Sequence, residues 1–203
     1  MIGLINLGNS NLQSVINALD YLKIDYFVTN NYQDLKKCNK FILPGVGSFA
    51  SGISRLKELN MFDSLKSEVL IENKPILGIC LGMQMLFNSS EESSGFEGLG
   101  LVGGKVVRLP INDHYKIPRI GWADSQLCSN FLGLEKHRNF DFYYVHSFHA
   151  QPDDPSIVMV DSDFGIVSAI KYKNIYGCQF HPEKSHKDGL KILEEFSKIK
   201  KIA

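Results

Sequence analysis

Short apolar runs and amphipathic stripes alternate through the first half of the chain. The apolar runs at 2–7, 26–28, 40–43 and 75–79 predict buried strands, because each is short and two of them, 2–7 and 40–43, stop at a glycine or a proline. Helices are predicted between and after them, where apolar side chains recur three and four residues apart: from Leu12 to Leu22 with Asn9 and Ser10 as capping candidates, within 48–59, within 62–72, and through Met83, Leu86 and Phe87. This alternation indicates βαβ units and a parallel sheet covered by helices on both faces.

The second half has a different pattern. Apolar segments at 106–109, 142–145, 166–170 and 175–180 predict strands with few helices between them. One last amphipathic helix carries Leu190, Leu193 and Phe196 on its apolar side. Because neither a repeat nor a linker divides the sequence, the pattern predicts one mixed α/β domain spanning residues 1–203.

Composition narrows the class of protein. The chain has 203 residues, 44% of them hydrophobic and 22% charged, which is typical of a globular domain. Its 22 basic and 22 acidic side chains balance, so bulk electrostatic binding of nucleic acid or of a membrane surface is not expected. Neither a signal peptide nor an apolar stretch long enough for a membrane helix is seen. We therefore expect a cytoplasmic protein with free thiols.

The sharpest chemical signal is residues 78–82, which read GICLG at the end of a predicted strand. Small residues around a central nucleophile, followed at once by a helix, are typical of a nucleophile elbow. Backbone N–H groups at the new helix N-terminus favour a thiolate, and the N–H of Leu81 is available to a developing oxyanion. Cys80 is therefore the candidate nucleophile; the alternative is a buried structural cysteine, as expected for Cys38, Cys128 and Cys178.

A base for this thiol is predicted at the end of another strand. His181 follows the strand at 175–180, and Glu183 lies two residues further on, so both side chains can lie on one face of an extended segment. The carboxylate would orient the imidazole and stabilise its charged form. A solvated strand-end turn is the alternative explanation of the same residues.

Other segments complete the predicted site. Residues 45–47 (GVG) end the third strand, and their glycines allow backbone N–H groups to point into a cavity beside Cys80. Gln84 lies one helical turn after Cys80 and can reach the same cavity. His146 and His149 lack a third partner for a metal ion, and the cysteine spacing gives no zinc pattern, so no metal is expected.

Together these segments resemble the class I, triad-type glutamine amidotransferases, and among them the glutaminase subunits of imidazole glycerol phosphate synthases. The resembling blocks follow the family's order along nearly the whole chain: 43–49 (LPGVGSF), 74–84 (KPILGICLGMQ), 98–101 (GLGL), 117–122 (IPRIGW), 142–147 (FYYVHS) and 179–185 (QFHPEKS). The resemblance implies three layers around a central, largely parallel, flavodoxin-like sheet, with more antiparallel strands in the C-terminal half.

The resemblance also implies an activity and a set of roles. Cys80 would attack L-glutamine, with His181 as general base and acid and Glu183 as the orienting carboxylate, without a cofactor. Ammonia would pass to a cyclase subunit in a heterodimer. The remaining roles would be oxyanion binding by the backbone of Val46, Gly47 and Leu81, substrate binding by Gln84, Glu92, His146, Ser147 and Phe148, and contact with the partner by Asn11, Tyr143 and Lys184.

Three alternatives remain at this point. A related glutaminase could supply ammonia to an enzyme that installs an acetamidino group on a surface sugar. A non-catalytic relative could act only as a scaffold that activates a partner, although its triad would then be broken. A cysteine peptidase on a related fold would lack the grip of Gln84 and Glu92 on the substrate.

Overall fold

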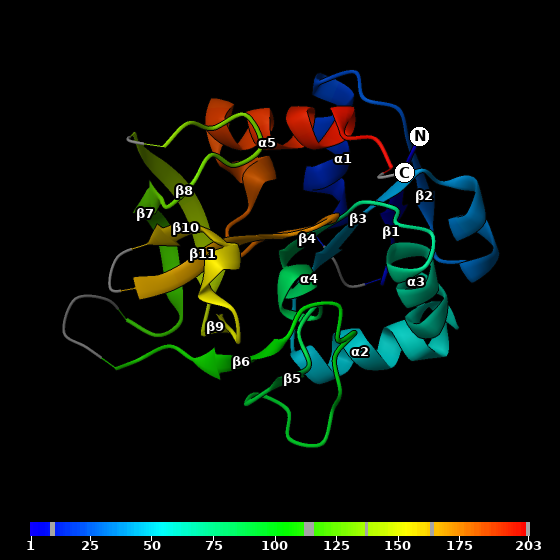
Figure 1. The fold of residues 1–203 in the computed structure, drawn as a ribbon, viewed down its shortest axis with the longest axis horizontal. Helices are drawn as coiled ribbons and strands as arrows, with labels where there is room; N and C mark the ends of the chain where they lie inside the picture. Colours follow the sequence, from blue (N-terminus) through cyan, green and yellow to red (C-terminus); the bar gives the residue numbers. More distant parts are fainter. Residues whose placement is uncertain (9–10, 112–115, 137, 163–164, 202–203) are drawn as a thin grey trace.

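The computed structural model describes residues 1–8, 11–111, 116–136, 138–162 and 165–201, and the strands within them form a nine-stranded and a three-stranded sheet (Figure 1). The large sheet has the order β2-β1-β3-β4-β12-β11-β10-β7-β8. Its first five strands are parallel: β2 (Tyr26–Thr29), β1 (Ile2–Ile5), β3 (Lys40–Gly45), β4 (Ile76–Cys80) and β12 (Ile175–Cys178). The other four pair antiparallel: β11 (Ile166–Tyr172), β10 (Val158–Ser162), β7 (Arg119–Leu127) and β8 (Asn139–His146).

Helices on both faces of the large sheet make three layers. On one face, α1 (Leu12–Tyr21) and α5 (His186–Lys198) share a core with the strands, and on the other lie α2 (Phe49–Glu58) and α3 (Met61–Leu70) (Figure 1). Alternate strand residues point into the two cores: Ile42 packs in the core with α1 and α5, and its neighbours Phe41 and Leu43 pack in the second core, with α2 and α3. The predicted three-layer α/β fold is confirmed.

The smaller sheet covers part of the second core. It contains β5 (Ser89–Ser90), β6 (Gly104–Arg108) and β9 (Phe148–Pro152), in that order. The predicted strand at 106–109 therefore exists as β6 but belongs to this sheet. Val106 and Ala150, which face each other across β6 and β9, are both buried in the core that also holds α2 and α3.

Two expectations were wrong in detail. The helix predicted through Leu86 and Phe87 ends early: α4 spans Leu81–Gln84, and the following turns keep both side chains buried without continuing the helix. The prediction also lacked β5, β7, β9 and β10, although residues 157–160 (IVMV) form a short apolar run at the start of β10. In β7 only part of the residues are buried and polar side chains interrupt the apolar ones, so an apolar run never forms. Asn9 and Ser10 lie outside the described residues, and the residue before α1 is Asn11.

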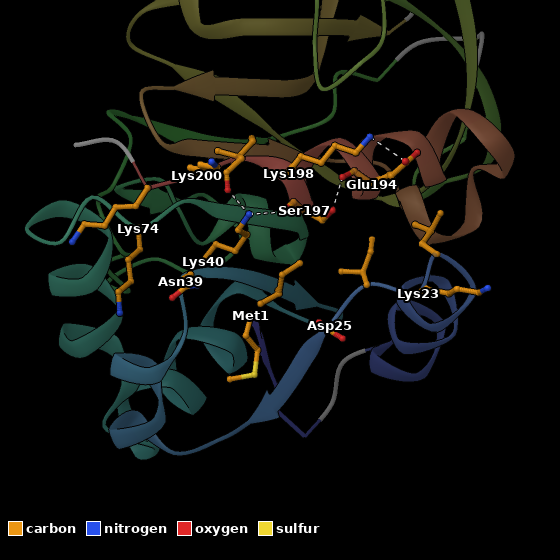
Figure 2. Close-up of a pocket in the computed structure, with 15 residues that line it drawn as sticks. Met1, Lys23, Asp25, Asn39, Lys40, Lys74, Glu194, Ser197, Lys198 and Lys200 are labelled. Atoms are coloured by element: carbon orange, nitrogen blue, oxygen red, sulfur yellow. Dashed lines mark hydrogen bonds and ion pairs between the residues drawn. The ribbon is translucent and has the colours of Figure 1, made fainter.

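Lys40 fixes the end of α5 to the start of β3. Its Nζ donates hydrogen bonds to the carbonyl oxygens of Ser197 (2.5 Å), Phe196 (3.4 Å) and Ile199. Carbonyls at a helix C-terminus lack partners within the helix, and Lys40 supplies a donor to them; the carbonyl of Phe196 also accepts the backbone N–H of Ile199 (3.2 Å). Figure 2 shows this side chain reaching Ser197 beside a surface hollow of about 670 Å³. The hollow lies where the parallel strands begin, at the edge of the sheet opposite to Cys80, which ends β4.

None of the described helices is long and apolar enough to cross a membrane.

Candidate active site

Cys80 lies at a sharp turn between β4 and α4. Its backbone has φ 54° and ψ −112°, a conformation that residues other than glycine rarely adopt. The neighbouring glycines are required by close packing: a Cβ on Gly82 would lie 1.7 Å from the carbonyl oxygen of Leu43, and one on Gly78 would lie 2.6 Å from the backbone nitrogen of Met83. The strained turn has the geometry predicted for a nucleophile elbow.

His181 and Glu183 lie beside this turn and are almost completely buried. The Nδ1 of His181 is 2.8 Å from Oε1 of Glu183, and the two side chains are 4% and 1% exposed. Burial lowers the pKa of His181, but its hydrogen bonds with Cys80 and Glu183 outweigh burial and raise the pKa to about 10. The protonated form of His181 is therefore favoured, with the Glu183 carboxylate at Nδ1 and the candidate nucleophile beside the ring.

A cavity of about 290 Å³ opens over Cys80. All the residues predicted to bind the oxyanion or the substrate line it, together with Pro118, Val145 and Lys184: Val46, Gly47, Leu81, Gln84, Glu92, His146, Ser147 and Phe148. Gly47 has φ +101°, so this segment uses the backbone freedom that the sequence indicated. Segments far apart in the sequence are thus collected around one thiol.

The two residues expected to grip the substrate are held by the protein. The Nε2 of Gln84 donates to the carbonyl oxygen of Phe148 (2.9 Å) and to Oε1 of Gln179 (3.0 Å). The Oε2 of Glu92 accepts the backbone N–H of Phe49 at the start of α2 (2.7 Å), which fixes this carboxylate at the rim of the cavity. Both side chains keep an oxygen for a bound molecule.

His146 stays neutral at physiological pH. Burial lowers its pKa to about 4, and its Nδ1 lies 2.9 Å from the carbonyl oxygen of Phe148. Because a carbonyl can only accept, Nδ1 carries the proton, and Nε2 is a buried atom without a partner in the described part of the chain. The Nδ1 of the other histidine of this segment, His149, is also a buried atom without a hydrogen-bond partner in the described part of the chain, and no group of three possible metal ligands occurs among the described residues.

The residues expected to face a partner divide into two kinds. The Nδ2 of Asn11 donates to Oε1 of Glu183 (3.0 Å), so this side chain contacts the triad itself. Lys184 is exposed, lines the cavity and places its Nζ 5.5 Å from the ring centre of Tyr143, which is half-buried. Asn11 thereby has a contact in the site that the sequence did not indicate.

Sequence reasoning missed Gln179. The side chain is completely buried, and its Nε2 donates to the Sγ of Cys80 at 3.8 Å. Its place in the block 179–185, two residues before the predicted His181, was the available signal. Among the other cysteines, Cys38 and Cys178 are buried as expected, but Cys128 is exposed because it follows the last residue of β7.

This arrangement can perform acyl transfer from a small polar substrate. It contains a thiol on a strained turn, a base within hydrogen-bonding reach, a buried carboxylate behind the base and backbone N–H groups beside the cavity. The volume suits a compact molecule better than a polypeptide.

Comparisons with known proteins identify the family and support the fold. The model of the family described as "Glutamine amidotransferase class-I" matches residues 3–199. A solved structure titled "Crystal structure of glutamine amidotransferase" superposes with a TM-score of 0.77, covering 96% of both chains at 17% identity. "Structure of PurLQS from Thermotoga maritima" gives a TM-score of 0.76 at 20% identity, again covering 96% of both. The chain belongs to the class I glutamine amidotransferase family.

Similar proteins at higher identity have more specific names. "Imidazole glycerol phosphate synthase subunit HisH 2" of Methanococcus maripaludis is 41% identical over 98% of this chain and 99% of its own length. "Imidazole glycerol phosphate synthase subunit HisH" of Pyrococcus furiosus is 41% identical over 98% of each chain, and that of Bacillus subtilis is 38% identical over 98% and 96%.

Proposed function

We propose that this chain is the glutaminase subunit of an imidazole glycerol phosphate synthase and serves histidine biosynthesis in the cytoplasm. It hydrolyses L-glutamine to L-glutamate and ammonia, and it passes the ammonia to a cyclase subunit. The observation that carries the proposal is the contact of His181 with both Cys80 and Glu183, beside a cavity large enough for glutamine. The names of relatives about 40% identical over nearly the full length support the pathway.

The reaction follows from the geometry in two halves. The Cys80 thiolate adds to the side-chain carbonyl carbon of glutamine, and the oxyanion is held by the N–H of Leu81 and by the backbone at Val46 and Gly47. The imidazolium of His181 gives its proton to the nitrogen, the C–N bond breaks, and ammonia leaves a γ-glutamyl thioester. His181 then takes a proton from water as the hydroxide adds to the thioester, and glutamate and the thiol are released.

Gln84, Glu92 and the backbone of residues 146–148 bind the amino-acid end of the substrate in this proposal. The Glu92 carboxylate lies at the cavity rim, where it can pair with the substrate ammonium. The free oxygen of Gln84 accepts a further donor. Because these groups and Cys80 line the same cavity, they orient the side-chain amide of glutamine toward the thiol.

A partner surface adjoins the cavity. Ile120 and Trp122 on β7 and Val145 on β8 are exposed apolar side chains on one face of neighbouring strands, and Val145 also lines the cavity. We assign this exposed patch, with Tyr143 and Lys184, to the cyclase interface. Ammonia in neutral water is mostly protonated and loses its nucleophilicity, so a contact at the cavity mouth serves direct transfer.

The test measures glutamate released from glutamine by the purified chain, with its Cys80→Ala variant as blank. Each protein is assayed alone and with the cyclase subunit from the same source, loaded with its nucleotide ligand. We expect release that needs Cys80 and that rises strongly with the loaded cyclase. Release that needs Cys80 but ignores the cyclase contradicts the pathway and favours the sugar-modifying alternative. Release without Cys80, or none under any condition, contradicts the glutaminase itself.

A further inference from the structure

The side chain of Gln179 lies between the candidate nucleophile and the residue expected to bind substrate. Gln179 follows β12, is completely buried, and contacts Cys80 on one side and Gln84 on the other. A buried carboxamide needs partners for both its oxygen and its nitrogen, because an unpaired polar group in the interior is costly. Here the two partners are the two groups that must be aligned for the reaction.

The direction of each hydrogen bond is fixed by a carbonyl oxygen. The carbonyl of Phe148 can only accept, so the atom of Gln84 that lies 2.9 Å from it must be the amide nitrogen. That nitrogen also lies 3.0 Å from the Gln179 side chain, which must present its oxygen. The amide nitrogen of Gln179 therefore points to the Sγ of Cys80, at 3.8 Å.

This chain of bonds has a consequence at each end. At the sulfur, Gln179 offers an N–H donor, which interacts more favourably with a thiolate than with a thiol. At Gln84, both N–H groups are used inside the protein, so its Oε1 is left as the acceptor for a donor group of the substrate. A reversed Gln179 amide would set its oxygen against the sulfur and its N–H against the N–H groups of Gln84.

We propose that Gln179 is a positioning residue for glutamine hydrolysis: its carboxamide donates to the Cys80 thiolate and holds the Gln84 amide in the orientation that accepts from the substrate. The inference rests on the proposed function in taking Cys80 as the nucleophile. The contact between Gln179 and the sulfur of Cys80 can be tested without glutamine.

The first experiment follows alkylation of Cys80 by iodoacetamide as a function of pH in the full chain, using the mass of the Cys80 peptide. Exposed Cys128 reports an internal reference rate in the same molecule. Gln179→Met removes the donor with little change of size, and Gln179→Glu replaces it with an acceptor. Gln126→Glu, at an exposed position of β7, is the matched control for the added charge.

We expect the midpoint of Cys80 alkylation to rise by about half a pH unit in Gln179→Met and by about one unit or more in Gln179→Glu, with Cys128 and the Gln126→Glu control unchanged. The other titratable groups around the sulfur are Glu92, His146, His181 and Lys184 at the cavity and Glu183 behind His181, and both variants leave them in place. We expect kcat/KM for glutamine to fall at least about tenfold, with effects on both kcat and KM.

Unchanged midpoints in folded variants overturn the proposal, even if activity falls. A measurement on the unmodified protein covers the case in which a variant does not fold. The Gln179 side-chain amide protons are followed by ¹H–¹⁵N NMR through the same pH range, and we expect them to shift with the midpoint of Cys80 alkylation. Amide protons that ignore this transition also overturn the proposal. Absence of glutamine hydrolysis with these shifts intact counts against the proposed function instead.

Discussion

His181 has two hydrogen-bond partners that act on its charge in the same direction. Contacts with Cys80 and Glu183 raise its pKa to about 10 against the opposing effect of burial. We therefore expect the imidazole to stay protonated at neutral pH and to lose its proton with a midpoint near 10. In Cys80→Ala one of the two partners is absent, so the midpoint should move down. Histidine ¹⁵N NMR titration measures both values, and a wild-type midpoint near 6.5 contradicts the ion pair.

Glu92 is expected to recognise the ammonium of the substrate. Glu92→Gln removes the charge but keeps an oxygen that can accept the N–H of Phe49, so the rim of the cavity is preserved. Because a hydrogen bond to a charged group contributes about 1.5–3 kcal/mol, KM for glutamine should rise about 10-fold to 100-fold while kcat changes less.

Glu91→Gln is the matched control for this substitution. Glu91 is the exposed neighbour of Glu92, and its carboxylate pairs with Lys105 away from the cavity lining. Steady-state glutaminase kinetics of the two variants should therefore differ sharply. Equal effects in both would show that general charge, and not a contact at the rim, sets KM.

At the scale of elements, the strand-to-helix corner depends on the absence of a side chain at Gly82. A Cβ there would collide with the carbonyl oxygen of Leu43 in the neighbouring strand β3, and backbone cannot move aside as a flexible side chain can. We expect Gly82→Ala to destabilise the protein by about 3 kcal/mol, measured by urea unfolding. Gly103→Ala is the control, because its Cβ meets only the end of the Asp153 side chain. Equal stability of the two variants contradicts the packing of the elbow.

The cap on α5 is a second element-scale feature. Lys40→Met keeps the aliphatic stem but removes the donor that the carbonyls of Phe196, Ser197 and Ile199 share, while Phe196 keeps the backbone N–H of Ile199. We expect a loss of about 1–3 kcal/mol in the free energy of unfolding. Lys200→Met, at an exposed lysine beside the same hollow, should change stability little. A Lys40→Met variant as stable as this control would show that water replaces the cap.

Burial on one face or on both faces decided which strands could be predicted from the sequence. The strands β1, β3 and β4 are buried on both faces and appear as apolar runs in the sequence, so their bounds were predicted to within two residues. In contrast, β7 pairs with β8 from Arg119 to Gln126, and these cross-strand contacts compensate for a segment of mixed polarity. Likewise, α4 ends at Gln84, and the turns that follow it bury Leu86 and Phe87. The helical spacing of these apolar residues in the sequence did not reveal those turns.

At the scale of the whole molecule, the candidate site is predictable where local patterns mark it. Cys80 is marked by its glycines, and His181 and Glu183 by the strand that precedes them. The bond from Asn11 to Glu183 joins residues 172 positions apart, and the bond from Gln179 to Cys80 joins residues 99 apart. Such contacts depend on the arrangement of β4, β12 and α1, which composition and spacing leave open.

The arrangement of the antiparallel half creates a surface that the core does not need. Ile120 is 64% exposed, and its cross-strand partner Val145 lines the cavity. If this patch is the cyclase interface, a charge placed on it must be desolvated when the complex forms. We expect Ile120→Glu to weaken binding of the cyclase at least about tenfold, measured by isothermal titration calorimetry, with an unchanged melting temperature.

Ile71→Glu is the matched control for the interface. Ile71 is 73% exposed at the end of α3, which lies on the opposite side of the molecule from β7 and β8 (Figure 1). The same charge there should leave the affinity for the cyclase unchanged, because hydrophobic exposure alone does not define a docking surface. If both variants bind the cyclase equally well, the partner does not dock on the patch beside the cavity. Direct transfer of ammonia from Cys80 would then need another exit.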